Sequence, residues 1–313
     1  MKKLFLHITL LISCTSLANC VQQPDSTLAN NVCMWLNIPS IKLEKINAGL
    51  TNISYIGLYN DKKCIVRLGR ENPEELGINR LCEMHCQQAS SEIGIAPKVL
   101  YADPDTGNMI SEFIHGNKLI LHENATLADV VQTFKKYHAL PCHTSFVTTT
   151  IFEKLHAMLE KTADNQPDFM SDNALQLMNE YLQIAEDHVQ QKTEYNGLCH
   201  CDLVAENFIS DGQKLWIIDW EYACWDNILI DLASFATELQ LTEPQINEML
   251  QLYFGNSWQE VSPDFQMMYA LYNLRNALWY TLRSRDFANN TETFHFMQQE
   301  AEKHIEIFFQ QIF

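Results

Sequence analysis

Four side chains able to do chemistry stand close together in the second half of the chain: His200, Asp202, Asn207 and Asp219. Carboxylate and amide oxygens are the ligands that hard divalent cations such as Mg²⁺ prefer. Phosphoryl transfer uses such a set, with one aspartate near the acceptor hydroxyl and an asparagine and an aspartate holding the metal. One aspartate and one asparagine near a turn are also common surface features, so the spacing alone leaves a purely structural interpretation open.

A β-hairpin is predicted to bring these residues together. Two apolar runs, Phe208-Ile209 and Leu215 to Ile218, flank Asp211-Gly212, a dipeptide typical of tight hairpin turns. The donors that precede the first run and Asp219, which follows the second, then converge at the open end of the hairpin.

The elements around the hairpin predict a mixed α+β architecture. The first part of the chain carries short apolar runs separated by turn residues, which indicate a small antiparallel sheet. A helix is expected from about Pro73 to Ile93, with Asn72 as its cap and Gly94 as its stop. The expected strands are Ile41–Ile46, Ile53–Tyr59, Cys64–Leu68, Val99–Ala102 and Asn108–Phe113.

Beyond Gly116 the apolar residues recur every three or four positions, as in helices. We therefore expect a small lobe over residues 26–115 and a larger, mainly helical lobe over residues 116–313, with residues 1–25 set apart. No linker is long enough to separate independent domains.

The stretch HCDLVAEN at 200–207, followed by IDWEYA at 218–223, resembles the choline kinase family, in particular its bacterial choline/ethanolamine kinases. That family belongs to the aminoglycoside phosphotransferase superfamily, which has a protein-kinase-like bilobal fold. The resemblance implies that Asp202 is the catalytic base, that Asn207 and Asp219 are Mg²⁺ ligands, and that His200 braces the loop. It also implies that Asp231 hydrogen-bonds the catalytic loop, although a helix N-cap is an alternative role for Asp231.

The same resemblance implies a nucleotide site in the first lobe, with ATP as co-substrate. The segment NAGLTN at 47–52 resembles the family's phosphate-covering loop, in which Gly49 lets backbone N–H groups approach phosphate and Thr51 and Asn52 follow. Arg67 resembles the strand residue that contacts nucleotide phosphate, and Glu83 is its expected ion-pair partner. A solvated helix face is the alternative for Glu83.

Glu221-Tyr222-Ala223 is the choline and ethanolamine kinase form of this motif, which implies an amine alcohol as acceptor. A quaternary ammonium is held by aromatic faces and neutralised by carboxylates. The candidates are Glu221, Tyr222, Trp225, Asp226, Trp279 and Tyr280. Aromatic residues at helical spacing also form cores, so for Trp279 and Tyr280 both interpretations stand.

Composition restricts the partners. The 313 residues hold 21 Lys and Arg against 39 Asp and Glu, a formal charge of -18, which disfavours nucleic acid and anionic membrane surfaces. The ten cysteines are scattered over a long chain, so we expect reduced thiols rather than a disulfide framework.

The N-terminus gives a conflicting signal about location. Lys2 and Lys3 precede an apolar run, and Leu11-Ile12-Ser13-Cys14 resembles a lipoprotein cleavage box. An enzyme that uses ATP belongs in the cytosol, and a true start near Met34 would reconcile the two. We expect a cytoplasmic protein.

The leading hypothesis is a Mg²⁺- and ATP-dependent kinase whose acceptor is a cationic alcohol, choline first. Ethanolamine, thiamine or another amine alcohol is the alternative acceptor. A non-catalytic protein that binds a cation on a kinase scaffold is the hypothesis from a different class.

Overall fold

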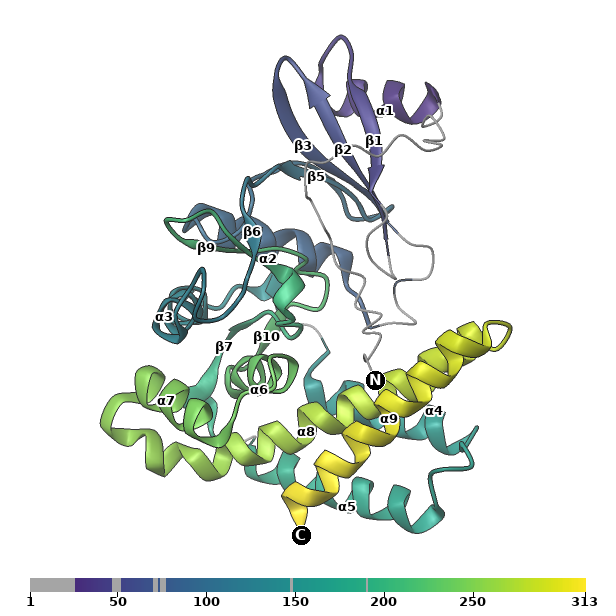
Figure 1. Cartoon of the computed structure of the whole chain (residues 1–313), viewed down its shortest axis with the longest axis vertical. Coiled ribbons are helices and arrows are strands. Elements are labelled where there is room, and N and C mark those ends of the chain that lie inside the picture. The colour runs from purple at the N-terminus through teal and green to yellow at the C-terminus, as the bar shows by residue number, and fades with distance from the viewer. Residues whose placement is uncertain (1–25, 47–51, 70–72, 74–76, 147–148, 190) are drawn as a thin grey trace. The chain divides into compact units, whose positions relative to one another are not determined.

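The computed structural model describes residues 26–313 except 47–51, 70–72, 74–76, 147–148 and 190 (Figure 1). The chain forms two compact units: residues up to 133 together with 205–222, and residues 134–204 together with 223–313. We call them the sheet unit and the helical unit. The two lobes predicted from the sequence, residues 26–115 and 116–313, have a different boundary from these units. The first unit extends past that point because β6 (Asn117–Lys118) pairs with β8 (Phe208–Ser210).

A five-stranded antiparallel sheet, in the order β1-β2-β3-β5-β4, forms the main part of the sheet unit. The sequence predicted all five strands with boundaries within two residues of those observed, and Asn60 and Asp61 at the β2–β3 turn adopt positive φ angles of 47° and 60°. The strands are β1 (Lys42–Ile46), β2 (Ile53–Tyr59), β3 (Lys62–Leu68), β4 (Val99–Asp103) and β5 (Asn108–Glu112).

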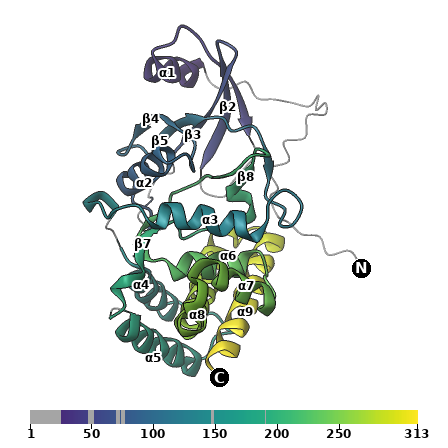
Figure 2. The same ribbon diagram turned by 90° about the vertical axis from the view of Figure 1, so that its left-hand side faces the viewer.

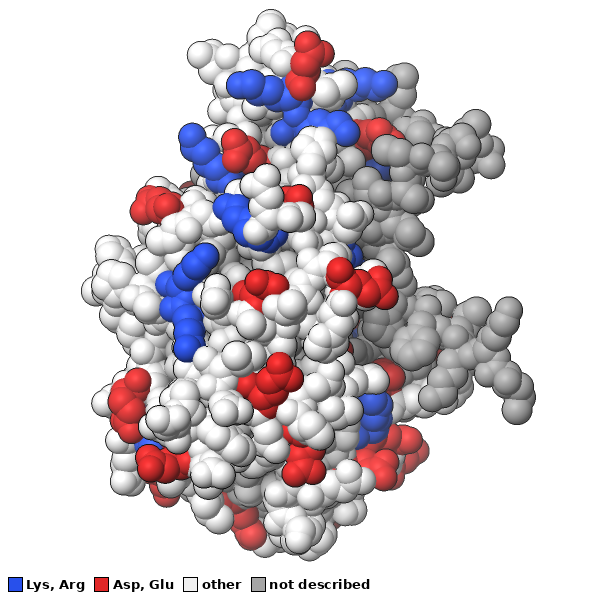
Figure 3. All heavy atoms as spheres, turned by 60° about the vertical axis from the view of Figure 1, so that its left-hand side comes forward, with Lys and Arg blue, Asp and Glu red and all other residues white. Residues whose placement is uncertain are grey.

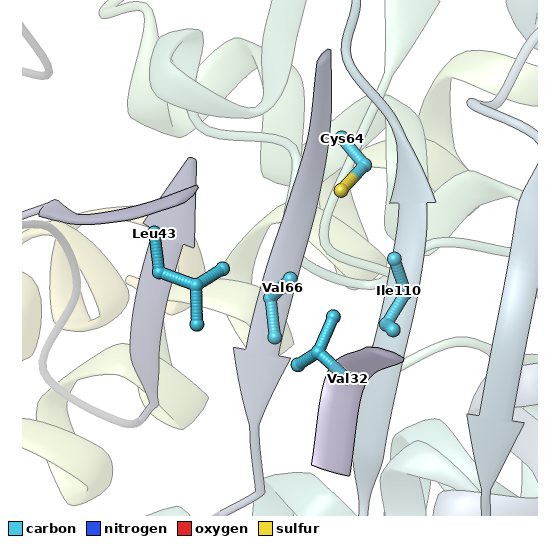
Figure 4. Close-up of a cluster of buried hydrophobic side chains, with 5 residues drawn as sticks. All are labelled: Val32, Leu43, Cys64, Val66 and Ile110. Atoms are coloured by element: carbon cyan, nitrogen blue, oxygen red, sulfur yellow. The ribbon is translucent and has the colours of Figure 1, made fainter. Parts of the chain in front are cut away.

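Helix α1 (Ser26–Leu36) covers one face of this sheet with an apolar cluster (Figure 4). Cys64 and Val66 point to that face because alternate residues of a strand share a side. Each fully buried aliphatic side chain of this size contributes roughly 1.5–3 kcal/mol. The cluster consists of Val32, Leu43, Cys64, Val66 and Ile110.

Helix α2 is shorter than predicted. It spans Arg80–Glu92 and begins after Asn79, whose side chain accepts a hydrogen bond from the Cys82 N–H at 3.0 Å. The prediction that the helix begins at Pro73 is wrong because Gly77, with φ 69°, interrupts the backbone before Asn79 caps it. The predicted cap Asn72 lies outside the described residues. The predicted stop is confirmed at Gly94, which has φ 75°.

The predicted hairpin is present in the sheet unit. Strand β8 pairs with β9 (Leu215–Ile217) in antiparallel register, with Phe208 opposite Ile217, and β6 adds a third strand. Gly116, just before β6, lies so close to this hairpin that an added Cβ would stand 2.4 Å from the Ser210 carbonyl oxygen. Close backbone packing therefore holds the hairpin in place.

The helical unit confirms the predicted helical second half. The long helices α8 and α9 lie side by side, and α8 also packs against α4 and α6 (Figures 1 and 2). Its helices are α4 (Ile151–Ala163), α5 (Asp172–Val189), α6 (Leu229–Glu238), α7 (Glu243–Phe254), α8 (Trp258–Ser284) and α9 (Thr291–Ile312), and the boundary between the units falls within α3 (Leu127–His138), after Thr133. One two-stranded ladder interrupts them, formed by β7 (Asn196–Cys199) and β10 (Cys224–Asn227).

Short 3₁₀ turns complete the chain path. They are η2 (Thr144–Phe146), η3 (Thr193–Tyr195), η4 (Ala205–Asn207), η5 (Gly255–Ser257) and η6 (Arg285–Phe287).

Acidic and basic side chains both appear on the face drawn in Figure 3. Among the described residues, no helix combines the length and the apolar character needed to cross a bilayer. Residues 1–25, for which the sequence left open a signal or lipoprotein segment and a misassigned start, lie outside the described part of the chain.

Candidate active site

The open end of the β8–β9 hairpin carries two of the predicted metal ligands. The Ile218 N–H donates to the Asn207 carbonyl at 2.9 Å, so Asn207, just before β8, and Asp219, just after β9, lie beyond the last strand pair at the open end. Asn207 is buried, whereas the Asp219 side chain is 38% exposed and its backbone has φ 65°. One amide and one carboxylate oxygen at the same end of a hairpin suit Mg²⁺, which takes one or two protein ligands and completes its shell with phosphates and water.

Arg67 and Glu83 form the predicted ion pair. The Arg67 guanidinium on β3 bonds the Glu83 carboxylate on α2, and its Nη1 also lies 3.6 Å from Asp219 Oδ1. Two other nitrogens of the same guanidinium, Nε and Nη2, are buried and have no hydrogen-bond acceptor among the described residues. A buried guanidinium with unused N–H groups beside a predicted metal ligand suits phosphate oxygens.

Arg80 joins this group and was missed from the sequence. Its Nη1 lies 2.8 Å from Glu83 Oε2 and 3.5 Å from Glu221 Oε2. Its Nη2 donates to Asn52 Oδ1 at 3.1 Å, and Asn52 Nδ2 in turn donates to Glu221 Oε2 at 2.9 Å. The available signal was the spacing of Arg80 and Glu83, three residues apart on one helix, which places them on the same face.

The charges of this buried group are mutually compensated. Burial works against ionisation of Glu83, but Arg67 and Arg80 outweigh it and hold the pKa of Glu83 below its usual value. Glu83 is only 1% exposed, so the alternative of a solvated helix face is excluded. We call Asn52, Arg67, Arg80, Glu83 and Glu221 the arginine network.

Glu221, which was predicted to bind the acceptor, instead contacts residues of the sheet unit that include those predicted to bind the nucleotide. Glu221 contacts Asn52 and Arg80 in the same unit as Arg67. The predicted loop residues Gly49 and Thr51 lie outside the described residues. The cofactor-side residues that the structure brings together are therefore Asn52, Arg67 and Glu83.

In the helical unit, Asp231 organises the loop that carries Asp202. Its carboxylate accepts the backbone N–H groups of His200 at 2.8 Å and Cys201 at 2.7 Å, and also the Tyr137 hydroxyl at 2.6 Å. The predicted contact between this aspartate and the loop is thus confirmed. His200 is fully buried, and Cys201 has φ 64°, a conformation that turns the chain sharply before Asp202.

Asp231 is held as a carboxylate although it is fully buried. Burial raises its pKa, but the neighbouring His138, His200 and the hydrogen bonds that it accepts lower the pKa of Asp231 below its ordinary value. His138 Nε2 lies 3.1 Å from Asp231 Oδ2. One charged side chain therefore fixes both the loop and the end of α3 that belongs to this unit.

Asp202 is one quarter exposed, and its Oδ1 lies 3.8 Å from Nη1 of Arg275 on α8. A second carboxylate, Glu238 at the end of α6, accepts the Tyr272 hydroxyl at 3.0 Å and the Asn276 amide at 2.7 Å through one oxygen. Glu238 was missed from the sequence. The signal was its position seven residues after Asp231, two turns along one helix and so on the same face.

The predicted acceptor aromatics take up different positions. Trp279 and Tyr280 on α8 contact each other edge to face at 5.1 Å. The Arg283 guanidinium lies 5.9 Å from the centre of the Trp279 ring, and Tyr280 stacks on His304 at 5.8 Å, so both rings already have neighbours.

The remaining acceptor candidates lie near the β7–β10 ladder. Tyr222 is buried before β10, and Trp225 is half-buried on β10 opposite Leu198. Asp226 is buried, and its two oxygens accept the backbone N–H groups of Ile151 at 2.7 Å and Asn227 at 2.7 Å. These bonds give Asp226 a structural task at the start of α4.

Comparison with known families identifies the chain. The family model for choline/ethanolamine kinases matches residues 43–259, most of the chain. The chain belongs to the choline/ethanolamine kinase family. It is therefore a phosphotransferase that acts on an alcohol group, an amine-alcohol kinase.

Individual proteins and solved structures are similar to the chain over most of its length. The chain is 23% identical over 247 residues to protein LicA of Haemophilus influenzae, covering 74% of this chain and 70% of LicA. Among solved structures it resembles choline kinase LicA from Streptococcus pneumoniae, with a TM-score of 0.69, 20% identity and coverage of 90% and 99%. It also resembles aminoglycoside 2′-phosphotransferase-IIIa in its GDP complex, with a TM-score of 0.63, 14% identity and coverage of 91% and 99%. The protein-kinase-like bilobal α+β fold of this amine-alcohol kinase is thereby established.

Proposed function

We propose that this kinase transfers the γ-phosphate of ATP to the hydroxyl of a small cationic alcohol, with choline as the preferred acceptor. The observation that carries the proposal is the pair of carboxylates in the helical unit, Asp202 and Glu238, which α8 contacts through Arg275 and through Tyr272 and Asn276. One carboxylate serves the hydroxyl and the other serves the cationic head. Such a division of tasks fits a molecule that carries both groups.

In this mechanism Asp202 accepts the hydroxyl proton as the acceptor oxygen forms its bond to the γ-phosphorus. The bond from that phosphorus to the β–γ bridging oxygen breaks, and ADP leaves with the electron pair. Arg67 contributes its unused N–H groups to the phosphates, and Asn207 and Asp219 would hold Mg²⁺. A bound Mg²⁺ supplies charge neutralisation on the phosphate oxygens.

Hydrogen-bond capacity at Glu238 favours choline over ethanolamine. The Oε1 atom of Glu238 already accepts two hydrogen bonds, from Tyr272 and Asn276. A primary ammonium has three N–H groups to satisfy, whereas a quaternary ammonium has none and needs only charge and apolar or aromatic contact. The half-buried rings of Trp279 and Tyr280 would supply that contact.

An ATP-coupled assay with choline, ethanolamine, thiamine and a neutral alcohol tests the proposal. We expect turnover with amine alcohols and the highest kcat/KM with choline. Asp202→Asn should lower kcat about 10²- to 10⁴-fold with little change in fold, since proton transfer is lost. Asp187→Asn, an exposed aspartate on α5, is the matched control and should retain full activity. Turnover of a neutral alcohol but of no amine alcohol would refute the proposed acceptor class.

A further inference from the structure

Arg275 is a cation placed on the acceptor side of the enzyme, where the proposed substrate is itself a cation. Its side chain is 13% exposed and lies on α8, with Nη1 3.8 Å from Oδ1 of Asp202. The same Nη1 donates to Asn276 Oδ1 at 2.9 Å, and the guanidinium lies 5.6 Å from the centre of the Tyr272 ring. These contacts hold Arg275 on two sides beside Asp202.

A chain of polar contacts links Arg275 to both carboxylates. Arg275 donates to the Asn276 oxygen, and the Asn276 nitrogen donates to Glu238. Tyr272 lies under the guanidinium and donates to the same Glu238 oxygen. The positive charge nevertheless stands beside Asp202, and the contacts that link it to Glu238 pass through the neutral side chains of Asn276 and Tyr272.

Two carboxylates and one cationic head create an ambiguity that a kinase must resolve. If the ammonium of the acceptor paired with Asp202, the hydroxyl would point away and the base would be blocked. If it paired with Glu238, the hydroxyl could reach Asp202. Both pairings are favourable to a cation unless one carboxylate is already compensated.

We propose that Arg275 is a specificity-determining residue that fixes the orientation of the acceptor: its guanidinium compensates Asp202 and repels the cationic head, so that the ammonium is left to Glu238. This inference rests on the proposed function. It assigns to Arg275 a repulsive role against the unproductive orientation, which is how many specific sites exclude a wrong arrangement.

The electrostatics of the neighbouring tyrosines agree with this arrangement. Burial raises the pKa of Tyr272, Glu238 and Asp202 raise it further, and Arg275 opposes them. The pKa of Tyr280 is likewise raised by burial, by Glu238, by Glu300 and by Asp202, again against Arg275. Glu300 is itself paired with Lys303 at 2.9 Å, so Asp202, Glu238 and Arg275 are the charges that the two hydroxyls have in common.

The decisive experiment measures binding of tetramethylammonium, a cationic head without a hydroxyl, by titration calorimetry. In the otherwise native enzyme, Glu238→Gln should weaken binding about tenfold or more, because Asp202 is paired with Arg275 whereas Glu238 has no ion-pair partner among the described residues. In the double variant Glu238→Gln/Arg275→Gln, binding should return to within about threefold of wild type, because Asp202 is now available to the cation. A double variant that binds no better than Glu238→Gln alone would overturn the inference.

Steady-state kinetics provide a second readout on the intact enzyme. In Arg275→Gln, choline should become an inhibitor of its own phosphorylation at high concentration, with kcat lowered about tenfold and the KM for ATP unchanged. Arg275→Lys keeps the positive charge, so its rate should saturate with choline concentration as in the wild type, without the substrate inhibition expected for Arg275→Gln. Inhibition that persists in Arg275→Lys but not in Arg275→Gln would contradict the role.

Controls separate this inference from folding and from the proposed function. Lys192→Gln removes another cation that pairs with α8, at 2.7 Å from Asp264, and should change neither tetramethylammonium binding nor the choline profile. Failure of the wild type to phosphorylate any amine alcohol would refute the proposed function, whereas an active wild type whose double variant fails to recover binding refutes only the role of Arg275.

Discussion

Glu83 compensates two buried guanidinium groups. Replacing it with glutamine leaves Arg67 and Arg80 without their carboxylate, and breaking a buried pair in this way costs about 3–5 kcal/mol. We expect Glu83→Gln to lower the free energy of unfolding by about that amount near neutral pH and to raise the KM for ATP, since Arg67 loses its anchor. Chemical denaturation and initial-rate kinetics measure the two effects. Glu92→Gln, an exposed site on the same helix, should change stability by only a few tenths of a kcal/mol.

The same residue gives a pH dependence with a defined sign. The pKa of Glu83 is lowered on folding, so the folded state binds its proton less readily than the unfolded state. The stabilisation is therefore complete above the ordinary value of 4.5 and is lost as the pH falls through the lower folded pKa. Wild type and Glu83→Gln should converge in stability below that pH. A stability difference that stays constant from neutral to strongly acidic pH would show that the charge of Glu83 is not the cause.

At this scale the sequence predicted residues whose role follows from a local motif and missed those whose role depends on packing. Asn207 and Asp219 were predicted to lie together because a hairpin turn fixes their separation. Arg80 was missed because its contact with Glu221 joins positions 141 apart, and Glu238 was missed because Tyr272 and Asn276 lie on another helix. Their spacing along the helix, three residues from Arg80 to Glu83 and seven from Asp231 to Glu238, places each pair on one helix face. That spacing does not show which other elements the face will contact.

At the scale of elements, α6 acts as the support of the catalytic loop. Its first turns carry Asp231, which accepts the N–H groups of His200 and Cys201, and Ser234, whose hydroxyl accepts the Leu203 N–H at 2.9 Å. The loop on either side of Asp202 is therefore anchored to one helix.

The two anchors should differ in strength. Asp231→Asn removes a charged acceptor and should cost about 1.5–3 kcal/mol for each weakened bond, together with a large loss of kcat. Ser234→Ala removes a neutral acceptor and should cost about 1 kcal/mol with a smaller loss of kcat. Thermal unfolding and turnover measured side by side test this order. A larger effect of Ser234→Ala than of Asp231→Asn would mean that α6 does not position the loop through the carboxylate.

The elements also show where sequence patterns fail. All five strands of the main sheet were placed closely because β-branched and aromatic runs end at turn residues. Helix α2 was given seven residues too many at its start, because Pro73 and two following glutamates are typical of a helix N-terminus, whereas Asn79 supplies the cap that the folded chain uses.

At the scale of the whole molecule, ligand binding should be visible as stability. A ligand at a hundred times its Kd adds about 2.7 kcal/mol to the folded state. We expect ATP with Mg²⁺ to raise the melting temperature by several degrees, and EDTA to remove the part that depends on the metal. Asp219→Asn should abolish that part.

Asp211→Asn, at the turn of the same hairpin, is the matched control and should retain the metal-dependent increase. Its carboxylate accepts the N–H groups of Gln213 and Lys214, so this variant is expected to lower the baseline stability only. An equal metal-dependent increase in Asp219→Asn and wild type would exclude Asp219 as a metal ligand.

The whole-chain architecture was predictable in kind, since strand patterns dominate the first part and helical periodicity the second. The division into units was not, because the pairing of β6 with β8 joins segments about ninety positions apart. Net charge gave no comparable guidance: the total of -18 says nothing of how a few arginines are grouped among buried carboxylates.

The thiols of Cys199, Cys201 and Cys224 are buried where β7 and β10 meet the catalytic loop, and Cys201 and Cys224 bring their sulfur atoms to 3.7 Å. Burial raises the pKa of Cys199, and hydrogen bonds among the three thiols, together with burial, raise the pKa of Cys201 and Cys224. Little thiolate is therefore present for alkylating reagents while the unit stays closed. These native thiols therefore report on local opening without an engineered cysteine. The rate at which a maleimide alkylates them measures how often the region around β7, β10 and the loop that carries Asp202 opens to solvent.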